Sequence, residues 1–145
     1  MKAELNLLTV EWTKLCNLKC IMCVSHGAGL YAGQADKQPG FMDQSLFESI
    51  VDQYTHLNPD WQNRSMIPQF QGEPTIHPKF LEYCEIMDKA DVQFSFTTNA
   101  LKLSREMVQE LVKLKNFRGF TVSMDGATKE TYERIRLRSN WETVL

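Results

Sequence analysis

The sequence predicts an α/β fold in which four parallel β-strands alternate with helices. Two observations predict it. Apolar segments of strand length alternate with amphipathic segments of helix length, and Gly, Pro, Asn or Asp residues interrupt the chain after the predicted strands. Such alternation is typical of βαβ units, whose right-handed crossovers make neighbouring strands parallel. With 145 residues, 43% of them hydrophobic, the chain can bury one core, so we expect one domain over residues 1–145.

Each element has its own sequence signal. Apolar, β-branched or aromatic segments predict strands at residues 4–12, 65–70, 92–96 and 119–124. Apolar residues at helical spacing predict helices at 43–57, 79–90, 104–116 and 128–136. Three of these helices begin at residues whose side chains favour helix N-caps: Asp43, Ser104 and Thr128.

Composition argues against several classes of partner. The formal net charge is -2 and the basic residues are spread along the chain, so we expect no nucleic-acid partner. The first apolar run is short, is flanked by Glu4 and Glu11, and has no small-residue cleavage site, so we expect neither a signal peptide nor a membrane partner. The expected location is the cytoplasm, where clustered cysteines hold metal more often than disulfides.

Residues that could bind a ligand or take part in catalysis follow every predicted strand. They are the clustered cysteines after the first strand, Gly72 and Glu73 after the second, Thr98 and Asn99 after the third, and Ser123 and Asp125 after the fourth. In a parallel sheet the C-terminal ends of all strands lie at one edge, where active sites of α/β proteins form. The sequence therefore predicts one site built from four separate segments.

Three cysteines, Cys16, Cys20 and Cys23, occur together in "CNLKCIMC". A structural zinc site usually needs four ligands, and no second Cys/His pair occurs at ligand spacing. Three thiolates from one loop suit a four-iron cluster in which one iron lacks a protein ligand, and an open iron can bind a small molecule. His26 as a fourth ligand of a zinc ion stays open as an alternative.

Several segments together resemble one enzyme family. "CNLKCIMC" resembles the C-x-x-x-C-x-x-C motif of the radical S-adenosylmethionine (radical SAM) enzymes, and "QGEP", "TTNA" and "SMDGATKETYERIR" resemble that superfamily's GGEP, TNG and S-x-D-G segments. The resemblance covers nearly the whole chain and looks closest to the SPASM branch, whose members modify peptides or proteins. It implies four strands forming about half of a partial TIM-type barrel, with the active site at their C-terminal ends.

The resemblance also implies a chemistry. The three cysteines would bind a [4Fe-4S] cluster whose fourth iron takes the amino and carboxylate groups of S-adenosylmethionine. Reductive cleavage would yield a 5'-deoxyadenosyl radical that abstracts hydrogen from an unidentified substrate, a peptide or a small molecule. An electron donor such as flavodoxin or ferredoxin would be a partner. The sequence identifies no general acid or base, and no catalytic residue is named.

Four positions take family roles by this resemblance. Gly72 and Glu73 would meet the methionyl ammonium through a backbone carbonyl and a carboxylate, and a side chain at position 72 would block that approach. Gln71 stands where the family motif has its first glycine. Ser123 and Arg136 resemble the residues that hold the carboxylate of S-adenosylmethionine, for which a guanidinium has suitable forked geometry.

Three further positions are cofactor-binding candidates. Met22 lies between the second and third cysteines, where the family often has an aromatic residue near the adenine. Asn99 and Asp125 belong to the matched motifs. For Glu73, Asn99 and Asp125 an ordinary role in turns is the alternative, since Asn and Asp bond their own backbone and tolerate left-handed conformations.

Length sets a further expectation. Four βα units make half of an eight-unit barrel, and the family usually builds six, so we expect residues 1–145 to be the N-terminal part of a radical SAM core domain. A partner chain or a dimer would then complete the barrel. Two alternatives remain: an iron-sulfur or zinc binding module without catalysis, and an inactive half-barrel subunit that needs a partner.

Overall fold

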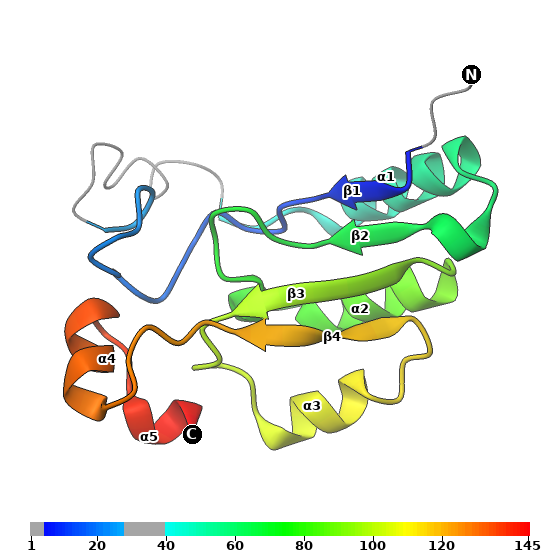
Figure 1. Cartoon of the computed structure of the whole chain (residues 1–145). Helices are drawn as coiled ribbons and strands as arrows, with labels where there is room; N and C mark the ends of the chain where they lie inside the picture. The colour runs from blue at the N-terminus through cyan, green and yellow to red at the C-terminus, as the bar shows by residue number, and fades with distance from the viewer. Residues whose placement is uncertain (1–4, 28–39) are drawn as a thin grey trace.

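The computed structural model describes residues 5–27 and 40–145. This part of the chain forms an α/β fold around one parallel sheet (Figure 1). Its strands are β1 (Leu7–Thr9), β2 (Ser65–Ile67), β3 (Gln93–Thr98) and β4 (Phe117–Val122). They lie in the order β1-β2-β3-β4, and each neighbouring pair is parallel. Parallel strands that follow one another in sequence order are the arrangement of one part of a βα barrel, so the predicted fold class is confirmed.

The observed strands differ from the predicted bounds where pairing or proline intervenes. β1 is shorter than the predicted 4–12, of which Glu4 lies outside the described residues. β2 ends before Pro68, which has no N–H to donate to a ladder. β4 begins two residues earlier than predicted because Phe117 pairs with Phe94 of β3. Pairing across the sheet, which the local pattern does not contain, decides where these strands begin and end.

Helices follow the strands as predicted. They are α1 (Gln44–Leu57), α2 (Phe80–Lys89), α3 (Arg105–Leu111), α4 (Lys129–Ile135) and α5 (Trp141–Val144), with short 3₁₀ helices η2 (Trp61–Asn63) and η3 (Pro74–Ile76). The predicted N-caps are confirmed, since Asp43, Ser104 and Thr128 each accept a hydrogen bond from a backbone N–H of the first turn. No helix in the described ranges is long and apolar enough to cross a membrane.

α3 is shorter than the predicted 104–116 because the chain must turn to enter the sheet. The helix ends at Leu111, and Asn116 already accepts a hydrogen bond from the backbone N–H of Phe94 at 3.0 Å. The Asn116 N–H in turn donates to the Asp88 carboxylate at 2.8 Å. These contacts fix the entry to β4.

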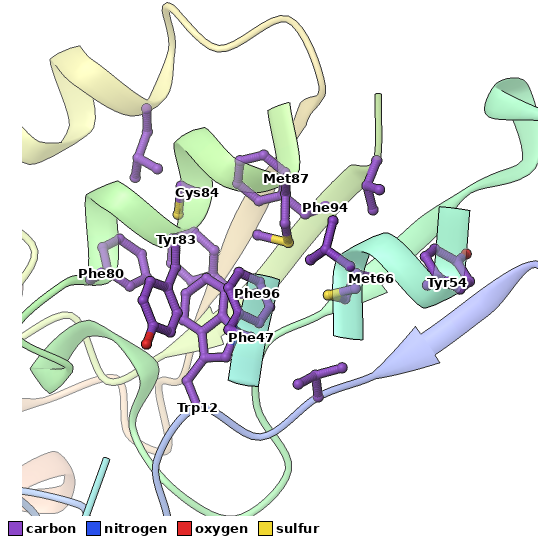
Figure 2. Close-up of a cluster of buried hydrophobic side chains, with 14 residues drawn as sticks. Trp12, Phe47, Tyr54, Met66, Phe80, Tyr83, Cys84, Met87, Phe94 and Phe96 are labelled. Carbon is purple, nitrogen blue, oxygen red and sulfur yellow. The ribbon is translucent and has the colours of Figure 1, made fainter. Parts of the chain in front are cut away.

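The core lies between the sheet and helices α1 and α2, with Trp12 among its fully buried side chains (Figure 2). The indole meets the rings of Phe47, Phe80 and Tyr83 edge to face, at centroid distances of 5.2, 5.9 and 5.2 Å. Aromatic contacts of this geometry add to the free energy gained from burial. Cys84 is fully buried in the same cluster, as a small apolar side chain would be. Trp12 lies between β1 and the first cysteine, so its packing in the core fixes where the cysteine loop begins.

His77 belongs to this core and not to the site. Its ring lies 4.5 Å from that of Tyr83, Nδ1 accepts from the backbone N–H of Lys79 at 3.1 Å, and Nε2 therefore donates to the carbonyl of Met42 at 3.2 Å. Burial lowers the pKa of the His77 imidazole. The neutral ring joins the loop before α2 to the segment before α1.

Candidate cofactor-binding site

A cavity of about 400 Å³ opens at the C-terminal ends of the strands. In Figure 1 the strand arrowheads, the loop after β1 and helix α4 all lie at this end of the sheet. Its lining includes most of the predicted site residues: Cys16, Cys20, Cys23, Met22, Gly72, Glu73, Asn99, Ser123 and Arg136. It also includes residues that the sequence did not single out as candidates: Leu18, Gln69, Phe70, Gln71 and Thr97. All four strand exits thus contribute to one cavity. Asp125 is not among the residues that line it.

The cysteine loop is built by its own backbone. The Cys23 N–H donates to the carbonyl of Cys20, and the Gly27 N–H to the carbonyl of Cys23, both at 3.0 Å. A Cβ at Gly27 would lie 2.2 Å from the Cys20 oxygen, so no other residue fits without moving the loop. The sequence analysis missed Gly27; its signal is a glycine four residues after the third cysteine.

The same loop is tied to the end of α4. The backbone N–H groups of Lys19 and Ile21 donate to the carbonyls of Leu137 and Ile135, at 3.0 and 2.9 Å. The last carbonyls of a helix have no partner within it and accept such bonds readily. Helix α4 therefore holds the segment that carries Cys20 in place.

The thiols sit in an environment that disfavours bare negative charge. Burial raises the pKa of the Cys16 thiol to about 11, and burial also raises the pKa of Cys20 although the Arg136 guanidinium opposes it. Without a metal these cysteines hold their protons at neutral pH. A cationic group that binds thiolates would displace the protons and relieve the charge, as metal centres do.

The alternative of a zinc ion finds less support in the arrangement of ligands. His26 Nε2 donates to the carbonyl of Lys14 at 2.6 Å, which leaves Nδ1 facing Cys23 Sγ at 3.9 Å. Within the described ranges, however, no three His, Cys, Asp or Glu side chains converge on a position for one metal ion. A zinc ion needs its ligands around one point, whereas in a cuboidal cluster each cysteine binds a different iron. The donor set fits a four-iron cluster better.

Gly72 allows two loops to touch. A Cβ at this position would lie 1.9 Å from the carbonyl oxygen of Thr13 and 2.9 Å from that of Leu15, so a side chain would collide with the segment before the cysteines. The sequence analysis expected a side chain here to block a ligand. The structure adds a different reason for glycine, which is close packing of backbone on backbone.

Glu73 joins the exits of two strands. Its buried carboxylate accepts from the Thr75 hydroxyl at 2.6 Å, from the Thr98 hydroxyl at 2.7 Å and, through Oε2, from the backbone N–H of Asn99 at 2.7 Å. It also accepts from the Thr75 N–H and so caps η3. Glu73 is therefore a turn residue and a cavity residue at once, and its ring of donors fixes where the carboxylate lies.

Asn99 reaches from β3 to the cysteine loop. Its Nδ2 donates to Asn17 Oδ1 at 2.8 Å and lies 3.9 Å from Cys16 Sγ, while its Oδ1 accepts from the backbone N–H of Leu101. Met22, on the same loop, is half exposed at the cavity, and Phe70 opposite the loop is 76% exposed. Hydrogen bonds thus fix the Asn99 side chain, whereas the apolar side chains of Met22 and Phe70 are exposed to solvent.

Arg136 has a carboxylate partner already. Its Nη2 pairs with Asp125 Oδ2 at 2.6 Å, and Nη1 lies 3.9 Å from Cys20 Sγ. Its Nε is buried and has no hydrogen-bond partner among the described residues. Ser123 lines the same cavity, and its N–H donates to the Thr98 carbonyl at 2.9 Å. Asp125 therefore orients Arg136 from outside the cavity, and Nε remains available for a further acceptor.

Comparisons with known proteins agree with this architecture. The family model described as the Radical SAM superfamily matches residues 10–145. The chain is 30% identical over 129 residues to "Mycofactocin maturase MftC" of Mycobacterium tuberculosis, covering 89% of this chain and 30% of that protein. It is 29% identical over 114 residues to the "Tungsten-containing aldehyde ferredoxin oxidoreductase cofactor-modifying protein" of Pyrococcus furiosus, covering 74% and 27%. The chain thus spans about 30% of the length of these curated relatives.

Solved structures share the fold at low sequence identity. BtrN in complex with AdoMet and 2-DOIA superimposes with a TM-score of 0.71 at 19% identity, covering 99% of this chain and 55% of that chain. Streptococcus suis SuiB bound to the precursor peptide SuiA gives a TM-score of 0.66 at 18% identity, covering 90% and 26%. At these identities the likeness concerns the fold alone.

Proposed function

Because the chain belongs to the radical SAM superfamily, with residues 10–145 matching its family model, we propose that it binds a [4Fe-4S] cluster and S-adenosylmethionine. When bound, these cofactors supply reductive cleavage of S-adenosylmethionine to a 5'-deoxyadenosyl radical that abstracts hydrogen from a substrate. The observation that carries the proposal is the single cavity that the three cysteines share with the exits of β2, β3 and β4. The chain's residues bind, orient and shield the cofactors.

The cysteines and Arg136 fit the proposed cluster. Cys16, Cys20 and Cys23 come from one loop and line one cavity, and three thiolates are the donor set of a four-iron cluster with one open iron. The Arg136 guanidinium near Cys20 adds positive charge where thiolates gather. Its buried Nε–H has no hydrogen-bond partner among the described residues, and with Ser123 we assign this donor to the carboxylate of S-adenosylmethionine.

The exits of β2 and β3 supply acceptors for the ammonium. Among the described residues Glu73 Oε2 accepts one hydrogen bond, from the Asn99 N–H, so a carboxylate oxygen with two lone pairs retains capacity for the methionyl ammonium. We assign the Gly72 carbonyl to the same group. Asn99 positions Glu73 and the cysteine loop, and the Met22 backbone is assigned to the adenine.

The substrate class and the partners extend the proposal. The relatives include a protein named a maturase and one named a cofactor-modifying protein, and SuiB was solved with a precursor peptide, which supports a SPASM-like enzyme acting on a peptide. Flavodoxin or ferredoxin is the proposed electron donor and the cytoplasm the proposed location, where thiols stay reduced. We propose that residues 1–145 are the N-terminal part of a core domain that further strands, a partner chain or a second copy complete.

Cluster assembly and its response to S-adenosylmethionine test the proposal. The chain is reconstituted anaerobically with iron and sulfide, reduced, and studied by electron paramagnetic resonance with and without S-adenosylmethionine. Cys20→Ala should lose the four-iron signal, whereas Cys84→Ala, a matched control because Cys84 is buried in the core, should keep it. A signal that S-adenosylmethionine leaves unchanged contradicts cofactor binding by this chain, and tight zinc with no cluster favours the structural module.

A further inference from the structure

The Glu11 side chain is hydrogen-bonded to the turn that follows β2. Its Oε1 accepts hydrogen bonds from the backbone N–H of Gln71 at 2.6 Å and of Gly72 at 3.0 Å. Hydrogen bonds to an ionised acceptor are about twice as strong as neutral ones. One carboxylate thus holds two consecutive peptide groups, although sixty residues separate it from them in the sequence.

A third backbone contact continues the same pattern. The N–H of Glu73 donates to the carbonyl of Leu15 at 2.9 Å, and Gly72 lies against the Thr13 carbonyl. Three successive N–H groups, those of residues 71, 72 and 73, therefore all point toward the segment 11–15. The turn cannot rotate without breaking these bonds.

The direction of these N–H groups fixes the direction of three carbonyls. The peptide bonds here are trans, and in a trans peptide the C=O points opposite to the N–H of the next residue. The carbonyls of Phe70, Gln71 and Gly72 therefore point away from the segment 11–15. All three residues line the cavity that holds the cysteines. Such a row of carbonyl oxygens is an acceptor array for a group with several N–H donors and positive charge.

We propose that Glu11 is a positioning residue, which holds the carbonyls of Phe70, Gln71 and Gly72 toward the cavity as acceptors for the ammonium of S-adenosylmethionine. The inference rests on the proposed function, and it adds a residue that lies outside the cavity and touches no cofactor. It also accounts for Gln71 at a position where the family motif has glycine. Glu11 bonds only the backbone N–H of residue 71, so the side chain of residue 71 is free to vary.

Three variants of the 145-residue chain test the positioning role of Glu11. Glu11→Ala removes the acceptor, and Glu11→Gln keeps an oxygen but not the charge. Glu48→Ala is the matched control, since Glu48 is an exposed carboxylate on α1 that accepts a hydrogen bond from Gln44. Amide hydrogen exchange at Gln71 and Gly72 is measured before cluster assembly. Affinities are then measured anaerobically on the reconstituted protein for S-adenosylmethionine and for an analogue that lacks the amino group.

Glu11→Ala should speed exchange at both amides and lower the affinity for S-adenosylmethionine roughly tenfold, with little change for the analogue. Glu11→Gln should lose roughly threefold, since a neutral acceptor makes a weaker bond, and it carries the test if Glu11→Ala does not fold. Glu48→Ala should change neither quantity.

Two results separate the inference from the function beneath it. If the wild-type chain binds S-adenosylmethionine and Glu11→Ala loses affinity equally for both ligands, or for neither, the positioning role is wrong while the proposed function stands. If the wild-type chain carries a cluster and binds neither ligand, the proposed function is wrong for this chain and the inference falls with it.

Discussion

Replacing Gly72 by alanine should destabilise the protein by opening the contact between two loops. The added Cβ would lie 1.9 Å from the Thr13 carbonyl oxygen and 2.8 Å from the Thr13 carbonyl carbon, whereas Cβ contacts under 3.0 Å are essentially not observed. The two backbones would have to separate by about 1 Å, which strains the hydrogen bonds that the Gly72 N–H donates to Glu11 and the Glu73 N–H donates to Leu15. Overpacking of this kind costs about 1 to 3 kcal/mol, and backbone gives way less easily than a side chain.

Thermal unfolding of the metal-free protein measures this cost. For a chain of this size 1 kcal/mol corresponds to about 2 to 4 °C, so Gly72→Ala should lower the Tm by about 2 to 12 °C. Gly119→Ala is the comparison: its Cβ would meet nothing within 4 Å, but its φ of +121° makes any side chain strained. Both variants should lose stability, and only Gly72→Ala should also impair cluster retention. A Gly72→Ala protein with wild-type Tm and wild-type cluster content would refute the packing argument.

Four further outcomes follow from the buried thiols, His77 and the ion pair. In the folded metal-free protein, burial raises the pKa of Cys84, so mass spectrometry should find this thiol alkylated only after unfolding; fast labelling of native protein would contradict its burial. The pKa of Cys16 is about 11, so its alkylation should quicken about tenfold per pH unit from about pH 8 to about pH 10, and a plateau in that range would argue against the shift. Burial lowers the pKa of His77 below its ordinary 6.5, so the unfolded chain binds more protons and stability should fall as the pH drops below about 6.5; His77→Gln should flatten that slope in urea titrations, and an unchanged slope would exclude His77 as the cause. Asp125 and Arg136 should show a coupling of about 0.5 to 1 kcal/mol in a double-mutant cycle at low salt, whereas no coupling would mean that Asp125 does not hold the guanidinium.

The elements of the fold were predictable because their signals are local. The N-caps at Asp43, Ser104 and Thr128 were identified correctly, since each depends on a residue type and the few residues after it. The start of β4 at Phe117 was not, because it depends on pairing with Phe94 across the sheet. Local pattern predicts that a strand exists, and partners decide its bounds.

The site was predictable in its outline and not in its connections. The motif order placed the cysteines, Gly72 and Glu73 at strand exits, and the structure brings them to one cavity. Glu11 was not a candidate because its partners are backbone N–H groups sixty residues away. Such partners cannot be recognised from the types of residue in the sequence. Asp125, a cofactor-binding candidate, pairs with Arg136, and its role at a cofactor stays a prediction.

The tie between the cysteine loop and α4 has a consequence for the order of assembly during synthesis. Lys19 and Ile21 receive their acceptors from Leu137 and Ile135, which a ribosome adds more than a hundred residues later. Until then the loop lacks these two bonds, and closing so long a loop is entropically costly. The thiols of a nascent chain therefore stand open to oxidants and stray metal ions until the segment 135–137 has been made and has docked. The complete cysteine loop therefore forms only after α4 has been made and has docked on it.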